Sequence, residues 1–293
     1  MKSGTVAVIG RANAGKSTLI NVIVGEKVSI VSPRPQTTRD RILGVLTEED
    51  CQIAFVDTPG LYRADNLLNS VMQKTTEDCA KDVDLILFVI DCHDGVSETD
   101  KNLLSKYSKT KIPVICVLSK TDIMPETLLI STLKELDTDV EIVPVSARKG
   151  KNIKELIKLI KSHLPDGDKL FDQDIISDRS ERFMVSEIMR EKILLKFDKE
   201  IPHGIAITVN KFALRDDGNC YDISLDIICE KAGHKAILIG KQGSAIKEVS
   251  SFARKDMEKF LGSKVFLTTY VKVKEDWRNS ASLIREHGYG ETD

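Results

Sequence analysis

The chain has 293 residues, long enough for about two domains, and 41% of them are hydrophobic, which is sufficient for a packed core. No run of 18 apolar residues occurs, which argues against a membrane span, and the net charge of −2 alone neither indicates nor excludes nucleic acid. The six cysteines form no C-x-x-C pair, so we expect free thiols in a reducing cytosol rather than a zinc site.

The chain begins with a strand, a glycine-rich loop and a helix. Residues 5–9 are apolar, residues 10–17 read G-R-A-N-A-G-K-S, and residues 18–24 have a helical pattern. The octet matches the phosphate-loop pattern G-x-x-x-x-G-K-[ST], in which backbone N–H groups surround phosphate oxygens at a helix N-terminus. We therefore expect a nucleoside triphosphate to bind at Gly10, Arg11, Ala12, Asn13, Ala14, Gly15, Lys16, Ser17 and Thr18.

The chain up to residue 165 alternates apolar runs with helical patterns. This alternation predicts an α/β domain with a mostly parallel sheet and helices on both faces. Residues 41–47 are expected to form an edge strand. The expected strands are 51–56, 84–90, 113–118 and 140–145, and the expected helices are 66–81, 97–108, 125–137 and 150–163. We expect this domain to span 1–165 and an acidic linker to follow at 166–180.

The remainder, 181–293, predicts a second domain of different composition. An amphipathic helix at 181–197 precedes two alternating strands, and the turn between those strands reads D-D-G-N at 216–219. Two helical pieces (234–240 and 243–261), a strand at 264–274 and a short final helix follow. Residues 231–274 carry 10 Lys and Arg against 3 Asp and Glu, so this segment is basic within an acidic half.

Two further motifs of the first domain fit the chemistry of a switch. Asp57-Thr58-Pro59-Gly60 ends an apolar strand, where Asp57 can hold Mg²⁺ through water and the Gly60 amide can donate to a γ-phosphate. The loop that holds Thr37 and Thr38 follows the first helix, and a threonine there completes the Mg²⁺ shell with Ser17 only when the γ-phosphate is present.

The base-binding motif predicts guanine. Ser119-Lys120-Thr121-Asp122 follows a strand, and a carboxylate at Asp122 can accept from guanine N1–H and the 2-amino group together. Adenine has neither donor there, so the motif selects GTP and GDP over ATP. Ser146-Ala147 follows the last strand, where a backbone amide can meet guanine O6. Together these motifs predict a GTPase.

With these motifs, the chain resembles the Era family of bacterial ribosome-assembly GTPases over essentially its full length. The resemblance is carried by 10–19 with Asn13, by P-Q-T-T-R at 35–39, by D-T-P-G at 57–60, by 187–192 followed by E-I-P-H at 200–203, and by I-G-K-Q-G at 239–243. Ser119 stands where the family has an asparagine that bonds guanine N7 and ties the base loop to the phosphate loop. Ala12 stands where proline is usual, which should matter little.

The position after Gly60 bears on hydrolysis. Leu61 occupies the place where many GTPases have a water-orienting glutamine. The resemblance implies that Asn13 ligates a potassium ion that offsets developing charge; the alternative is that Asn13 satisfies backbone groups of its loop. We therefore assign catalysis to Lys16, Thr38, Gly60 and Asn13, nominate no general base, and expect slow intrinsic turnover.

The basic segment of the second domain predicts RNA binding. Gly240, Lys241, Gln242 and Gly243 join two helical pieces, the order of a type II KH fold, in which a G-x-x-G loop approaches an RNA backbone. The phosphate contacts that we expect come from Lys235, Lys241, Lys247, Arg254 and Lys255, although such lysines are often only solvated.

The resemblance implies that the RNA is the 3′ end of small-subunit (16S) ribosomal RNA and that the role is 30S subunit assembly. The alternative is a GTP-gated protein-interaction or membrane-associated cell-cycle regulator without an RNA role. We expect a cytoplasmic monomer that binds no DNA, with peripheral association at the inner face of the cell membrane as a further option.

Overall fold

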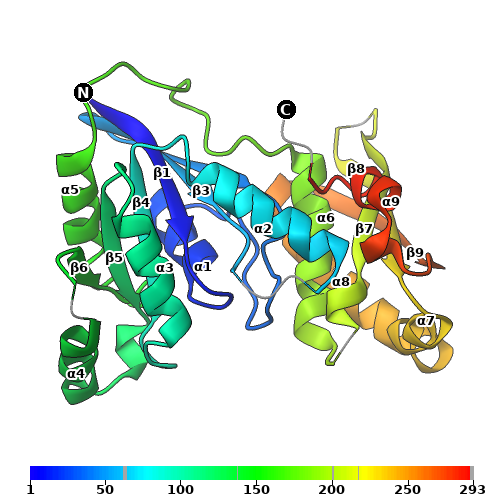
Figure 1. The fold of residues 1–293 in the computed structure, drawn as a ribbon. Coiled ribbons are helices and arrows are strands. Elements are labelled where there is room, and N and C mark those ends of the chain that lie inside the picture. The colour runs from blue at the N-terminus through cyan, green and yellow to red at the C-terminus, as the bar shows by residue number, and fades with distance from the viewer. Residues whose placement is uncertain (62–64, 137, 200, 217, 291–293) are drawn as a thin grey trace. The chain divides into compact units, whose positions relative to one another are not determined.

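A computed structural model of the chain describes residues 1–61, 65–136, 138–199, 201–216 and 218–290 (Figure 1). The chain divides into two compact units. The first holds 1–31, 38–63 and 72–178, and the second holds 32–37, 64–71 and 179–293. Among the described residues, no helix has the length and apolar character needed to cross a membrane.

The first unit is built on a six-stranded sheet in the order β2-β3-β1-β4-β5-β6. Only β2 runs antiparallel to its neighbour, as the predicted edge strand, so the α/β fold with a mostly parallel sheet is confirmed. The strands are β1 (Lys2–Ile9), β2 (Ile42–Thr47), β3 (Cys51–Asp57), β4 (Leu85–Asp91), β5 (Val114–Ser119) and β6 (Glu141–Pro144).

Helices cover both faces of this sheet because successive residues of each buried strand point to opposite sides. Val6 and Val8 pack with α1 (Lys16–Val24) and α5 (Ile153–His163), whereas Ala7 and Ile9 pack in the core that holds residues of α3 (Glu98–Ser108). The remaining helices that begin before residue 165 are α2 (Leu67–Cys79), the short 3-10 helix η1 (Thr121–Ile123) and α4 (Glu126–Leu136).

The predicted linker is bonded to the edge of the sheet. Val45 N donates to Ile176 O over 2.8 Å, and Leu43 N donates to the Asp178 carboxylate over 2.9 Å. The buried side chain of Gln52 bonds Phe171 through both backbone groups. Because an edge strand exposes unpaired backbone groups, a polar segment that satisfies them is held in place. The linker residues 166–178 therefore cluster with the first unit.

The second unit contains a three-stranded sheet in the order β7-β8-β9. β8 runs antiparallel to β7 and parallel to β9. In chain order the elements are α6 (Glu181–Lys196), η2 (Pro202–Gly204), β7 (Ala206–Leu214), β8 (Cys220–Cys229), α7 (Ala232–Ile239), η3 (Lys241–Gly243), α8 (Ser244–Leu261), β9 (Lys264–Val273), η4 (Trp277–Asn279) and α9 (Ala281–Glu286). This is the predicted KH order of helix, two strands, two helices and strand.

Trp277, the single tryptophan of the chain, lies inside this unit. Its side chain is fully buried, and its ring N–H donates to Gly204 O over 2.9 Å. It therefore packs the C-terminal helices and offers no ring for a base. Residues 137, 200, 217 and 291–293, which fall within predicted elements or motifs, lie outside the described residues.

Candidate GTP and RNA sites

The phosphate loop connects β1 to α1, as predicted, and two glycines give it its shape. Gly15, at the N-terminal cap of α1, has φ 95°, and Asn13 within the loop has φ 64°. A Cβ on Gly10 would lie 2.2 Å from Val89 O in the neighbouring strand. Only glycine fits where backbone approaches this closely, so the path of the loop is fixed by β4.

Lys16 lies buried within the loop that precedes it. Its ammonium donates to Gly10 O over 3.1 Å and to Arg11 O over 3.0 Å. Burial lowers the pKa of Lys16 to about 8, although the carboxylate of Asp57 opposes this shift. A buried ammonium that donates its hydrogen bonds to carbonyl oxygens is poised to gain stabilisation from an anion, which is the role expected of a phosphate-binding lysine.

Three oxygen-bearing side chains from separate elements meet beside Lys16. Ser17 Oγ lies 2.9 Å from Thr38 Oγ1, which lies 3.4 Å from Asp57 Oδ2. Asp57 is fully buried, which raises the pKa of its carboxyl group, and the charge of Lys16 lowers it. Its second oxygen, Oδ1, has no hydrogen-bond partner among the described residues. Hydroxyl and carboxylate oxygens that converge in this way are suitable ligands for Mg²⁺.

The D-T-P-G motif is packed directly against the phosphate loop. A Cβ on Gly60 would lie 2.6 Å from Ala12 Cα, so a larger residue would force the two loops apart. Leu61 N donates to Gly10 O over 3.1 Å, and Thr58 Oγ1 donates to Val8 O over 2.8 Å. The Gly60 backbone is thus held beside the loop that should surround the phosphates.

The phosphate loop has a further support that the sequence patterns do not indicate. Arg11 Nε donates to the carboxylate of Asp100 over 2.8 Å, and Asp100 is fully buried. Asp100 also bonds Ser97 in the capping box that begins α3. The two partners are 89 positions apart. Since no local motif links them, only the fold reveals this contact.

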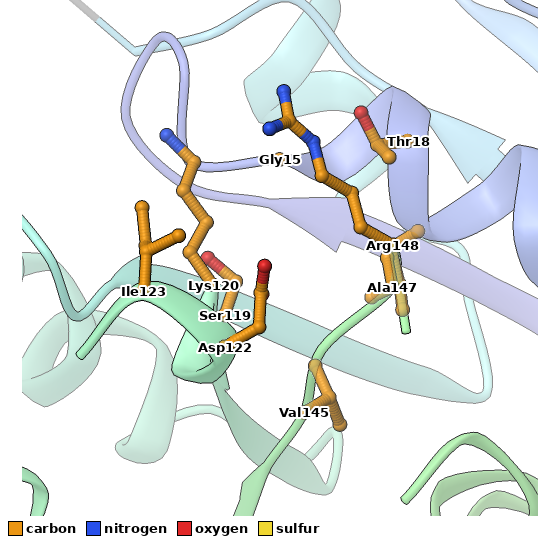
Figure 2. A pocket seen from close by; sticks show the side chains of 10 residues that line it. Gly15, Thr18, Ser119, Lys120, Asp122, Ile123, Val145, Ala147 and Arg148 are labelled. Atoms are coloured by element: carbon orange, nitrogen blue, oxygen red, sulfur yellow. The ribbon is translucent and has the colours of Figure 1, made fainter. Parts of the chain in front are cut away.

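The predicted guanine motifs line one pocket next to the phosphate loop (Figure 2). Ser146 Oγ donates to Asp122 over 2.6 Å, and this hydrogen bond lowers the pKa of the Asp122 carboxyl group. Lys120 lies at φ 59°, and its ammonium bonds Asp91 over 2.5 Å. The pocket is lined by Gly15, Thr18, Leu19, Ser119, Lys120, Asp122, Ile123, Val145, Ala147 and Arg148. Of these, the motifs did not include Leu19, Ile123, Val145 and Arg148; the signal available in the sequence was that each is adjacent to a predicted motif.

In the second unit, the G-x-x-G loop lies between α7 and α8. Gly240 has φ 73°, and a Cβ on it would lie 2.7 Å from that of Ala245. Gly243 has φ 78° with no atom near its missing Cβ, and the side chains of Lys241 and Gln242 are exposed. The first glycine is therefore required by packing, whereas the second leaves open space beside the backbone.

The basic side chains that we expect to contact phosphate differ in their exposure. Lys241, Lys247 and Lys255 are exposed, whereas Lys235 and Arg254 are partly buried. Arg254 donates to the carboxylate of Glu258 one turn along α8, over 2.8 Å. The exposed lysines are the better candidates for contacts with phosphate, because a paired arginine must first leave its partner.

The segment 32–37 of the predicted switch loop belongs to the second unit. There the guanidinium of Arg190, on α6, donates to Gln36 O over 3.3 Å and to Thr37 O. Arg190 is almost fully buried and is held by Glu187, with Nε to Oε1 at 2.7 Å. The next residue, Thr38, belongs to the first unit, where it contacts Ser17.

The chain is 47% identical to GTPase Era of Clostridium kluyveri over 292 residues, which cover 99% of both chains, and 46% identical to GTPase Era of Clostridium botulinum over 98% of both. The chain belongs to the Era family. It is a GTPase, and the family model of a 50S ribosome-binding GTPase matches residues 5–120. The model of a KH domain matches residues 200–278.

Solved structures of Era proteins have the same fold. The structure of a point variant of Aquifex aeolicus Era bound to GDP·AlF₄⁻ is similar with a TM-score of 0.94 and 38% identity over 99% of this chain and 100% of that one. A structure of Era in complex with MgGDPNP and nucleotides 1506–1542 of 16S ribosomal RNA has a TM-score of 0.95, with the same identity and coverage. The predicted GTPase and KH folds are thereby confirmed.

Proposed function

We propose that this GTPase is an RNA-binding switch that binds small-subunit ribosomal RNA near its 3′ end and assists assembly of the 30S subunit. The observation that carries the proposal is the similarity, along nearly the whole chain, to an Era structure in complex with MgGDPNP and 16S nucleotides 1506–1542. The KH order of the second unit and its exposed Lys241 and Gln242 support the same assignment.

We assign the nucleotide to the first unit. Lys16 and the amides of the phosphate loop bind the phosphates, and the Gly60 amide donates to the γ-phosphate. Asp122, held by Ser146, reads guanine N1–H and the 2-amino group, while the amide of Ala147 meets O6. The buried, unpartnered Oδ1 of Asp57 supports a divalent cation beside Ser17 and Thr38. Mg²⁺ bound there would neutralise phosphate charge.

Several finer assignments stay part of the proposal. Asn13 lies exposed on the phosphate loop, which is compatible with the potassium role that we propose for it. We keep the domain limits at 1–165 and 181–293, with the bonded segment 166–180 between them. A cytoplasmic location, a monomeric state and peripheral membrane association remain predictions.

RNA binding is tested by placing an aspartate in the open side of the KH loop. Gly243→Asp adds a negative charge where an RNA backbone should pass, and we expect the affinity for a short single-stranded RNA with the 16S 3′-end sequence to fall about tenfold or more. The matched control is Gly218→Asp, because Gly218 in the β7–β8 turn also has positive φ (69°) and no atom near its missing Cβ.

Fluorescence anisotropy at fixed salt measures both variants against the wild type. Binding that survives in the control and is lost in Gly243→Asp supports the proposal. If the wild type does not bind this RNA more tightly than a scrambled RNA of the same length, the proposal fails and the protein-interaction alternative is favoured.

A further inference from the structure

Ser119 is held between two backbone carbonyl oxygens at the end of β5. Its hydroxyl lies 2.6 Å from Ala14 O in the phosphate loop and 3.1 Å from Ile90 O at the end of β4. The side chain is 5% exposed. Because both neighbours are acceptors, the hydroxyl is the donor, and a serine hydroxyl has only one proton to give.

This arrangement restricts what Ser119 can do for a bound base. Guanine N7 is an acceptor and carries no hydrogen, so it can only be read by a donor. The proton of Ser119 is already directed at backbone oxygens. An asparagine amide has two N–H groups as well as an oxygen, so it could bond a carbonyl and the base at once.

We propose that Ser119 preserves the hydrogen bond from the base-binding motif to the phosphate loop and makes no hydrogen bond to guanine N7. Selectivity for guanine then comes from the opposite side of the base, where the ionised Asp122 is fixed by Ser146. This inference rests on the proposed position of guanine in the pocket of Figure 2. The pocket should accept guanine nucleotides altered at N7 as well as it accepts natural ones.

The test compares the affinities of GDP and 7-deaza-GDP, in which a C–H group replaces N7, by isothermal titration calorimetry. The wild type should bind the two within about twofold, because no hydrogen bond is lost. Ser119→Asn should prefer GDP by about two- to tenfold, the range expected of one neutral hydrogen bond. Ser119→Ala should bind both ligands more weakly and to the same degree, since it loses the contacts with Ala14 O and Ile90 O but no contact with the base.

A wild type that loses tenfold or more with 7-deaza-GDP overturns the inference, and so does a Ser119→Asn variant with no preference. If Ser119→Ala has the nucleotide affinities and the thermal unfolding of the wild type, the hydrogen bond from Ser119 to Ala14 O contributes neither to binding nor to stability. Inosine diphosphate, which lacks the 2-amino group, and ADP test the underlying site. If both bind as tightly as GDP, the proposed base site is wrong whatever the deaza result.

Discussion

The glycines of the phosphate site and those of the KH loop are constrained in different ways. In the phosphate site, Gly10 and Gly60 have backbone atoms 2.2 and 2.6 Å from where a Cβ would lie. In the KH loop, a Cβ on Gly240 would lie 2.7 Å from Ala245 Cβ, whereas one on Gly243 would have no atom within 4 Å. Both of these phosphate-site glycines are fixed by packing, whereas the KH loop is packed at Gly240 and open at Gly243. A methyl group should therefore disturb the phosphate site at Gly60 and be tolerated in the KH loop at Gly243.

The largest change that we expect is in base selection, in the pocket next to the phosphate loop. Asp122→Asn exchanges an acceptor for a donor opposite guanine N1–H, so GTP should be lost and xanthosine triphosphate gained, with a change in preference of about 10⁴. Steady-state hydrolysis of the two nucleotides measures this. Normal GTP hydrolysis by the variant would mean that Asp122 does not read the base.

Substitution of one glycine by alanine in each loop compares how well the two loops tolerate an added methyl group. Gly60→Ala must move Ala12 or the D-T-P-G loop, and we expect hydrolysis to fall by about 100-fold or more as the Gly60 amide is displaced. Gly243→Ala meets no atom, and RNA affinity should change less than about threefold despite the positive φ. Equal sensitivity of the two functions would contradict the difference between the loops.

A monovalent cation should have a smaller effect on hydrolysis. We expect potassium to accelerate turnover about tenfold over sodium at matched ionic strength, less than the roughly 10³ or more of an arginine finger. Asn13→Ala should remove the difference. Equal rates in the two salts for the wild type would exclude the proposed role of Asn13.

The smallest effect concerns stability without nucleotide. The pKa of Lys16 is lowered to about 8 by burial, so between pH 8 and the ordinary lysine value the unfolded chain binds more protons than the folded one. The free energy of unfolding should therefore rise with pH in this window, relative to Lys16→Met. Urea unfolding at about pH 7.5 and about pH 9.5 measures the difference, and a parallel pH response in both proteins would contradict the lowered pKa of Lys16.

Local sequence patterns were sufficient to predict the helices and strands and to locate the nucleotide motifs. The strand, loop and helix around Lys16, for example, are contiguous in the chain. Local patterns could not reveal contacts between distant residues. Asp100 supports Arg11 from α3, and Arg190 holds the carbonyl oxygens of Gln36 and Thr37 from α6.

The acidic segment 166–180 shows the same limit. Its polar composition is typical of a tether, yet the Ile176 carbonyl and the Asp178 carboxylate accept hydrogen bonds from backbone N–H groups of β2. Ser119 is the opposite case, since its identity was plain from the sequence but its two carbonyl partners were not. Contact partners of this kind depend on register and packing, which composition does not encode.

The central claim is that the GTP site and the RNA loop influence each other. Thr38 contacts Ser17 in one unit, and the preceding Thr37 is held by Arg190 in the other, so ordering of this loop by a γ-phosphate has a covalent path to the unit that contains the KH loop. By reciprocity, RNA must then favour GTP by the same factor by which GTP favours RNA. Arg190→Lys replaces the planar guanidinium, whose separate nitrogens donate to Glu187 and to the two carbonyl oxygens, with a single ammonium nitrogen, so it should reduce this factor.

The direct measurement is the dissociation constant of the 16S 3′-end RNA at fixed salt, with GDP and with a non-hydrolysable GTP analogue. We predict tighter binding with the analogue by about 5- to 150-fold, the usual range of allosteric coupling, and a smaller ratio in Arg190→Lys. Identical constants in the two nucleotide states of the wild type would contradict the switch and leave two independent activities on one chain.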